Sequence, residues 1–126
     1  DAFVFEITAP TRVLMDSLAP NNDARWLWSL TGPRGVEIGG RALYHSESFE
    51  LGDASPVVEL LLPGTYRLDI SGQGVTGNYA FRLLDLDTAT DITAGEVVSG
   101  QFNPVNETDL YRFTVPEAGG RYYLDR

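Results

Sequence analysis

The sequence contains no cysteine, no lysine and a single histidine. Without cysteine there is no disulfide framework, no thiolate metal site and no cysteine nucleophile. One histidine is also insufficient for most transition-metal sites. Because lysine is absent, all nine basic residues are arginine, and since no spacing pattern attaches to them, this bias indicates no function.

Long apolar runs are also missing. No stretch approaches the ~18 consecutive apolar residues of a membrane helix, and no charged segment followed by an apolar one resembles a secretion leader. The sequence therefore predicts no membrane insertion. Because the chain begins with Asp1 and not with Met, we expect it to be a piece of a longer or processed polypeptide.

Positive charge is scarce. The 126 residues include 18 Asp and Glu against nine basic residues, a formal net charge of −9. This balance argues against nucleic acid as a partner, because a phosphate backbone needs a basic patch, and the same field repels anionic lipids. A hydrophobic content of 43% is typical of a globular chain, and the length predicts one domain of ordinary size.

What the sequence does contain is an apolar period of two residues, which is typical of strands with one buried face. Clusters of Pro, Gly, Asn and Asp interrupt this period, as turns do between strands. The pattern predicts an all-β fold, a jelly-roll-like antiparallel β-sandwich of about eight or nine strands with little or no helix. The segments with strand character are residues 2–7, 11–18, 24–30, 41–45, 48–51, 57–62, 64–72, 78–86, 96–102 and 110–115.

Residues 64–72 and 78–86 both alternate apolar and polar side chains, and the glycine-rich stretch GQGVTG connects them. Glycine supplies the positive φ angles that hairpin loops need. We therefore expect these two segments to pair as a hairpin.

The two ends of the chain repeat each other. Asp1 aligns with Asp109, an offset of 109 minus 1, or 108 residues. The inward-facing residues of the first strand are matched in kind, Phe3, Phe5 and Ile7 by Tyr111, Phe113 and Val115. After a one-residue insertion in the turn, residues 12–16 align with residues 121–125. Self-similarity at a fixed period predicts an array of modules.

This period predicts the domain organisation. Residues 1–86 would form the main body of one β-sandwich repeat, residues 87–95 a linker, and residues 96–126 the first strands of the next repeat. The strand EVVSGQF, residues 96–102, is then expected to fold back and complete the first sandwich in permuted fashion. The alternative is that the duplicated strands are frayed or swapped between chains.

Three motifs carry a family resemblance. An Asp-x-Tyr-x-Phe strand is present at residues 109–113, with Phe for Tyr at residues 1–5, and a Pro-Gly-Thr-Tyr strand at residues 63–66. A Gly-x-Tyr-x-Phe strand follows at residues 77–81. In order and spacing these motifs resemble the bacterial pre-peptidase C-terminal domain. The resemblance implies a jelly-roll-like sandwich, accessory to secreted proteins and without catalysis of its own, in a family where some members bind Ca²⁺ or polymers such as collagen.

Two loops gather oxygen-bearing side chains, and Ca²⁺ takes six to eight oxygen ligands. The candidate metal ligands are Asn106, Glu107 and Asp109 in one loop, and Asp16, Asn22 and Asp23 in the other. Ca²⁺ is thus the one cofactor that the sequence points to. The alternative is that these residues shape turns and cap backbone groups, and neither loop has the spacing of an EF-hand.

Trp26 and Trp28 stand two residues apart on one predicted strand and therefore face the same way. They are either core residues or an aromatic platform for carbohydrate. His45, Ser46 and Glu47 do not predict a catalytic triad, because neighbours on a strand point to opposite faces. We identify no catalytic residues.

These observations predict a non-catalytic repeat module of a large secreted or cell-surface bacterial protein, acting as a spacer and as an adhesion or interaction domain. Its partners would be neighbouring repeats of the same chain. The alternative is an accessory module of an extracellular hydrolase that binds Ca²⁺ or a polysaccharide or protein polymer. An enzyme is the least favoured class.

Overall fold

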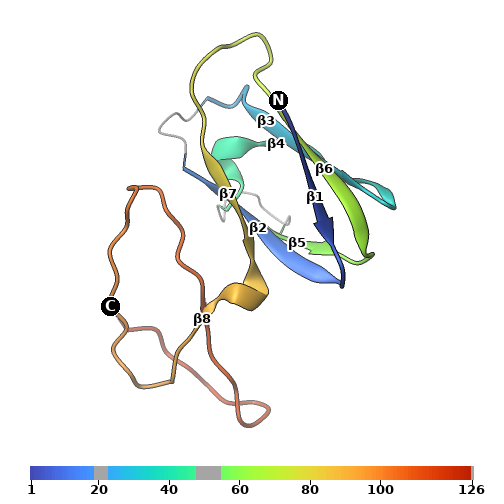
Figure 1. Cartoon of the computed structure of the whole chain (residues 1–126). Helices are drawn as coiled ribbons and strands as arrows, with labels where there is room; N and C mark the ends of the chain where they lie inside the picture. Colours follow the sequence, from blue (N-terminus) through green and yellow to red (C-terminus); the bar gives the residue numbers. More distant parts are fainter. Residues whose placement is uncertain (19–22, 48–54, 126) are drawn as a thin grey trace.

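The computed structural model describes residues 1–18, 23–47 and 55–125 (Figure 1). Asn22 and the expected strand at residues 48–51 lie outside the described residues. The described elements are strands and two single-turn 3-10 segments, which confirms the all-β prediction. The strands are β1 (Ala2–Ile7), β2 (Thr11–Ser17), β3 (Leu27–Gly32), β4 (Gly35–Ala42), β5 (Val57–Leu60), β6 (Gly64–Ser71), β7 (Phe81–Asp85), β8 (Thr90–Asp91) and β9 (Tyr111–Arg112), and the 3-10 segments are η1 (Leu43–His45) and η3 (Leu86–Thr88).

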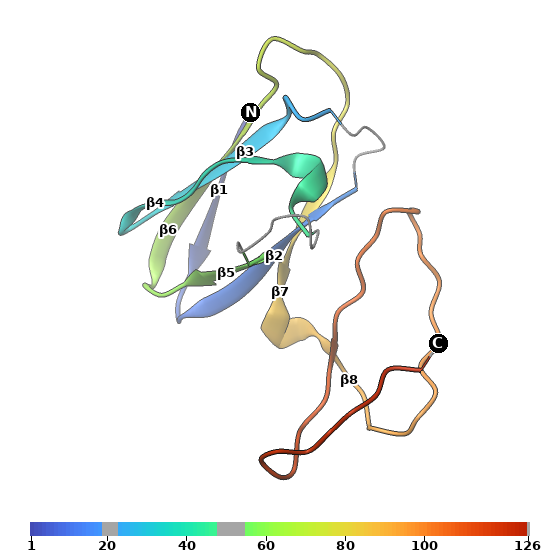
Figure 2. The ribbon, with the colours of Figure 1, turned by 180° about the vertical axis from the view of Figure 1, so that it is seen from behind.

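Strands β1 to β7 form two facing antiparallel sheets (Figures 1 and 2). The first sheet has the order β1-β6-β3-β4 and the second the order β5-β2-β7. Only β3 and β4 follow each other in the chain within one sheet; every other connection among these strands crosses to the facing sheet. The result is an antiparallel β-sandwich in which, apart from β3 and β4, neighbouring strands are distant in sequence.

The core lies between the two sheets and consists mainly of alternate residues of their central strands. Its members are at most 7% exposed and include Val13, Met15, Trp28, Leu30, Val58, Leu60, Tyr66, Leu68 and Ile70. The Tyr66 hydroxyl donates to the Leu62 carbonyl oxygen over 2.8 Å, so its polar end is satisfied. Gly32 makes room for this ring, because a Cβ atom there would stand 2.2 Å from Tyr66 Cε1.

The predicted hairpin of residues 64–72 with 78–86 is wrong. Strand β6 pairs with β1 on one side and β3 on the other, so both of its edges are occupied. Strand β7 pairs with β2 in the facing sheet. Residues 72–80 therefore cross between the sheets. Alternation and a glycine-rich connection suit a hairpin and a crossing equally, and the pairing is decided by strands far away in sequence.

After η3 the chain leaves the sandwich and runs out as an extended loop (Figures 1 and 2). Residues 96–102, expected to fold back as a strand, form none and add to neither sheet. Of the strand expected at residues 110–115, only β9 forms, as a two-residue parallel pair with β8. A strand needs a neighbour to receive its backbone hydrogen bonds, and alternation in the sequence does not supply one.

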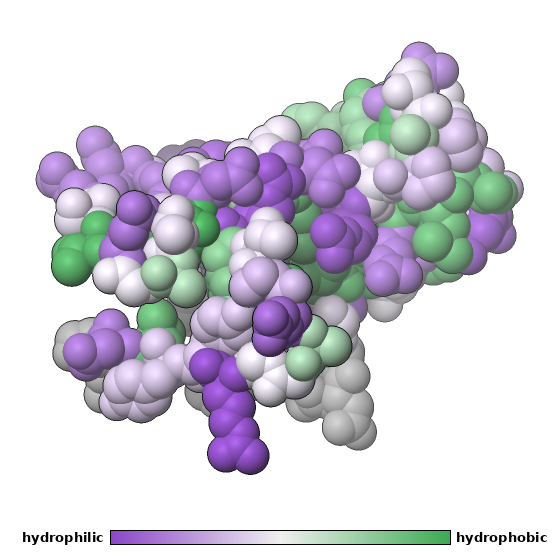
Figure 3. Space-filling model, turned by 90° about the horizontal axis from the view of Figure 1, so that it is seen from below, coloured by the Kyte–Doolittle hydropathy of each residue, from purple (hydrophilic) through white to green (hydrophobic). Residues whose placement is uncertain are grey.

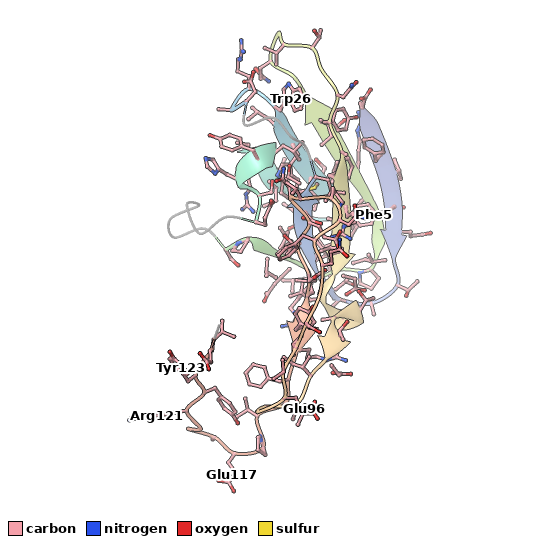
Figure 4. The ribbon with its side chains drawn as sticks, turned by 90° about the vertical axis from the view of Figure 1, so that its left-hand side faces the viewer. Phe5, Trp26, Glu96, Glu117, Arg121 and Tyr123 are labelled. Atoms are coloured by element: carbon pink, nitrogen blue, oxygen red, sulfur yellow. The ribbon has the colours of Figure 1, made fainter. Side chains whose placement is uncertain are left out.

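The two copies of the repeated segment therefore differ in structure. The first copy supplies β1 and β2, one for each sheet of the sandwich. The second copy, residues 109–125, lies outside both sheets, with Tyr123 89% and Leu124 90% exposed. Figure 4 shows Glu117, Arg121 and Tyr123 at the far end of the extended segment, away from Phe5 and Trp26 in the sandwich.

Candidate functional site

Asp16 and Arg82 form an ion pair on the outer face of the second sheet. They stand opposite each other in the pairing of β2 with β7. Arg82 Nη2 and Nε donate to Asp16 Oδ2 over 2.6 and 2.8 Å. The Asp16 side chain is fully buried, whereas that of Arg82 is 38% exposed. Arg82 also donates to the Thr108 carbonyl oxygen over 3.2 Å, which places the chain near Thr108 over this face.

Arg82 is the common counter-ion of three predicted calcium ligands. Besides Asp16, it lies 3.8 Å from the Glu107 carboxylate, measured from Nη1 to Oε1. The hydrogen bond with Asp16, and then the charges of Asp16, Glu107 and Asp109, raise the pKa of Arg82. A carboxylate removed from water needs a cation close by, and here the chain supplies one itself.

An open pocket of about 350 Å³ lies beside this ion pair. It is bounded by the end of β2, by residues near η1 and by residues 102–108, and its lining includes Ser17, Glu47 and Glu107. The Ser17 amide donates to Glu47 Oε2 over 3.3 Å. Asp16 and Glu107, candidate ligands from separate loops in the sequence, both lie beside Arg82, and Glu107 also lines the pocket.

The surroundings of Glu47 in this pocket disfavour its charged form. Burial raises its pKa, and the negative charge of Asp16 raises it further, while hydrogen bonding from the Ser17 amide opposes the shift. Desolvation disfavours the charged form of an acid, and a like charge acts in the same direction. The pocket thus holds a carboxyl group that retains its proton to higher pH than an exposed glutamate.

Two buried oxygen atoms beside the pocket lack a hydrogen-bond partner among the described residues, Asp16 Oδ1 and Ser17 Oγ. Unsatisfied buried polar atoms are uncommon, because leaving one costs about 1–3 kcal/mol. The carboxylates of Asp16 and Glu107 both lie beside the Arg82 guanidinium, and the charge of Asp16 also acts on Glu47. This chemistry suits a bound cation or ordered water.

The remaining predicted ligands of the 106–109 loop are divided. Asn106 lines the same pocket as Glu107, whereas Asp109 is exposed. Glu107 Oε2 also accepts a hydrogen bond from the Asn103 amide over 3.3 Å, within its own loop. The Glu107 carboxylate therefore also stabilises the turn of its own loop.

Asp23 is held in a turn and not in a ligand cluster. Its Oδ1 accepts from the Arg25 amide over 2.9 Å, and the Arg25 guanidinium contacts both carboxylate oxygens over 2.8 and 3.0 Å. Arg25 lowers the pKa of Asp23 through these hydrogen bonds. Within residues 1–18, 23–47 and 55–125, no group of three or more His, Asp or Glu side chains has an arrangement that could hold a metal ion.

Trp26 and Trp28 belong to the core. Trp28 is fully buried and Trp26 is 5% exposed, so neither ring presents a face to a carbohydrate, and the platform hypothesis is wrong. Trp28 Nε1 donates to Ser46 Oγ over 2.7 Å. Ser46 is itself buried, and its hydroxyl lies 2.8 Å from the Leu43 carbonyl oxygen. Ser46 therefore serves as the hydrogen-bond acceptor of the buried Trp28 indole.

Sequence reasoning missed Ser17, Glu47 and Arg82 as members of the site. Each lies on or next to an ordinary strand segment, and only the pairing of β2 with β7 and the position of η1 bring them together.

No helix within the described residues is long and apolar enough to span a membrane. Comparisons with protein-family models, with curated proteins and with solved structures gave no match.

Proposed function

We propose that this chain is a non-catalytic repeat module of a large secreted or cell-surface protein, where it serves as a spacer and as an adhesion or interaction domain. The observation that carries this proposal is the duplication of β1 and β2 at residues 109–125, outside the sandwich that β1 to β7 form. A copied strand pair without its sandwich is expected where one module of an array meets the next.

Side-chain placement in the second copy supports this interpretation. The Phe113 and Tyr122 rings lie 5.1 Å apart between centroids, and their counterparts Phe5 and Val13 line one groove of the sandwich. Phe113 and Tyr122 are 45% and 46% exposed. Exposed apolar groups that align with residues packed in the first sandwich are expected where a further sandwich covers them.

The extracellular location rests on the resemblance to the pre-peptidase C-terminal domain and remains a prediction. The net charge of −9 is consistent with a repeat module of this kind. The mixed surface of polar and apolar residues seen in Figure 3 agrees with a spacer that contacts its neighbours over limited areas.

A fusion chain tests the proposal. Residues 17–86 are appended after residue 125, so that the second copy is followed by a second set of strands β3 to β7. We expect the fusion to unfold with about twice the enthalpy of the single module, because unfolding enthalpy scales with the number of residues folded. Tyr123, which aligns with Leu14, should lose its exposure to solvent quenchers.

Two further versions control this experiment. Tyr122→Val restores the residue type found at the aligned core position Val13 and removes the strain of a larger ring. Phe113→Asp combined with Leu124→Asp should abolish folding of the second sandwich only. The proposal fails if neither the fusion nor its Tyr122→Val version folds a second sandwich, or if the double aspartate version unfolds like the parent fusion.

Binding of Ca²⁺ is a second candidate function, favoured by the unpartnered Asp16 Oδ1 and Ser17 Oγ beside the carboxylates of Glu47 and Glu107. Only part of the six to eight oxygen ligands of Ca²⁺ need be carboxylates, since carbonyl groups, hydroxyl groups and water complete the shell. The ion would remove the repulsion between Asp16 and Glu47.

Thermal unfolding in chelator-treated buffer, with and without millimolar Ca²⁺, tests this second candidate. A ligand that binds only the folded state raises the unfolding temperature. The rise should disappear in Glu107→Gln and persist in Asp23→Asn, whose carboxylate is held by Arg25. No rise in the parent chain, or an equal rise with Glu107→Gln, contradicts a site in this pocket.

A further inference from the structure

The two sheets of the sandwich are unequal. Four strands of the first sheet face three of the second, and β1 and β7 are edge strands. These two edges lie on the same side of the molecule, because the Phe3 and Phe81 rings meet edge to face with centroids 5.2 Å apart. Phe3 is nevertheless 42% exposed. Strand β1 therefore lacks a full covering strand in the second sheet.

A groove lies between the edge strands on this side. Its volume is about 460 Å³. Its apolar lining includes Phe5 and Ile7 from β1, Val13 from β2 and Leu83 from β7, and the acidic residues Glu6, Asp85 and Asp87 also line it. Phe5, Ile7 and Leu83 pack against the core but remain only partly buried. The groove is thus a lateral opening of the hydrophobic core, next to a strand edge with backbone groups available for pairing.

Residues 96–102 have the pattern of a strand that could close this opening. Val98, Gly100 and Phe102 alternate with Val97, Ser99 and Gln101, so that two apolar side chains fall on one face of an extended chain. In this structure the segment is not a strand, and Val98 and Phe102 are 44% and 63% exposed. It therefore has strand character without a sheet to join.

The repeat period places this segment relative to the groove. Phe102 stands 109 minus 102, or seven, residues before Asp109, the counterpart of Asp1. In an array of modules, each copy of residues 96–102 thus comes directly before the sandwich whose β1 follows. A short connection keeps its effective concentration at that sandwich high.

We propose that the groove between β1 and β7 binds a second copy of residues 96–102, which pairs with the edge of β7 as the fourth strand of the second sheet. Val98 and Phe102 of that copy lie over Phe5, Ile7 and Leu83. The inference rests on the proposed function, because the second copy is the one that precedes each module in the array. It adds that consecutive modules are joined by strand addition, and not by a flexible linker alone.

A synthetic peptide of residues 93–107 tests the proposal against the full chain carrying Val98→Asp and Phe102→Asp, so that the chain's own segment does not compete. We expect saturable changes in amide chemical shifts, largest in Ala2–Ile7 and Phe81–Asp85, and a higher unfolding temperature. A peptide with the same two aspartates should bind at least about tenfold more weakly, because charged groups would replace the apolar side chains expected over Phe5, Ile7 and Leu83 in a groove that acidic residues also line. A Val97→Asp peptide, changed on the opposite face, should bind within about threefold of the parent peptide.

Three results overturn the proposal: no saturable binding at millimolar peptide, equal binding of the two aspartate-bearing peptides, or shift changes centred on the outer face around Leu14. Analytical ultracentrifugation gives an independent check. The unmodified chain should self-associate with rising concentration and the Val98→Asp, Phe102→Asp chain should not; equal behaviour counts against strand addition. The control variants of the fusion experiment change only Phe113, Tyr122 and Leu124, outside residues 96–102, so failure of the array and failure of the groove are distinguishable.

Discussion

At the scale of single residues, the buried carboxylates lie beside a cation or a hydrogen-bond donor. Asp16 contacts Arg82, the side chain of Glu37 is 7% exposed and contacts Arg34 over 2.7 Å, and Glu47 accepts from the Ser17 amide. Desolvation of an unpaired carboxylate is strongly unfavourable. Substitutions that remove the partner of one of these carboxylates are therefore expected to destabilise the folded sandwich.

The Asp16–Arg82 pair gives an asymmetric prediction. Arg82→Ala leaves a fully buried charge at Asp16 and should lower the free energy of unfolding by about 3 kcal/mol, toward the lower end for buried pairs because Arg82 is partly exposed. Asp16→Asn keeps the shape and leaves a partly exposed arginine that water reaches, so its cost should be about 1 kcal/mol. Urea unfolding of both variants measures how much unfolding free energy each one loses, and equal losses would contradict the burial argument.

Glu47 gives a prediction with a defined pH dependence. Since the folded state raises its pKa above the ordinary value of 4.5, the charged form destabilises the fold, and the loss is complete above the raised pKa. Glu47→Gln should therefore unfold at a higher temperature than the parent chain at pH 7. The difference should shrink as the pH falls through the raised pKa and vanish below the ordinary one.

The measurement is a series of thermal melts of both chains between pH 3 and about pH 8. Glu59→Gln, a change at an exposed position of β5, is the matched control and should show no such pH-dependent gap. A stabilisation of Glu47→Gln that is the same at all pH values would mean that charge is not its cause.

Sequence reasoning found part of this site. In the sequence, Asp16 and Glu107 are ligand candidates because of their loops, whereas Arg82 lies within the expected strand at residues 78–86 and carries no such signal. Two oppositely charged residues on outer faces pair when their strands are neighbours. Knowing that β2 lies beside β7 would have been enough to join them, and that knowledge is not local to either segment.

At the scale of elements, most strands from β1 to β7 overlap segments of apolar alternation, while their partners do not follow from it. The strand expected at residues 41–45 is wrong, because β4 covers Gly35–Ala42 and Leu43–His45 form η1. Period-two patterning marks a half-buried strand, and register and neighbour are set by tertiary packing. The hairpin of residues 64–72 with 78–86 and the strand at residues 96–102 were mispredicted for this one reason. Glycine-rich connections serve crossings as well as hairpins.

The crossing between β6 and β7 can be tested by changing its length. Replacing residues 72–80 by Asn-Gly, which favours a two-residue hairpin, should abolish cooperative unfolding, because the shortened loop cannot reach the facing sheet. Inserting three glycines should lower the free energy of unfolding by less than about 1 kcal/mol, since closure entropy grows slowly with length. Circular dichroism melts decide, and a folded Asn-Gly variant would contradict the observed pairing.

At the scale of the whole molecule, the chain holds one sandwich and a second copy of its first two strands. The copies are not equivalent: Tyr122 occupies the position of Val13, which is a 4% exposed core residue. Overfilling a packed position costs about 1–3 kcal/mol. The second copy therefore differs from the first at a position that is tightly packed in this sandwich.

The central claim is that the first copy of the repeated segment is required for this sandwich to fold and that the second copy is not. Two truncations, compared by thermal unfolding, test it most directly. Residues 1–112 should melt within about 3 °C of the full chain, as expected for loss of exposed residues only. Residues 18–126, which lack β1 and β2 but retain the second copy, should show no cooperative transition. A folded 18–126 chain, or an unfolded 1–112 chain, would contradict the account.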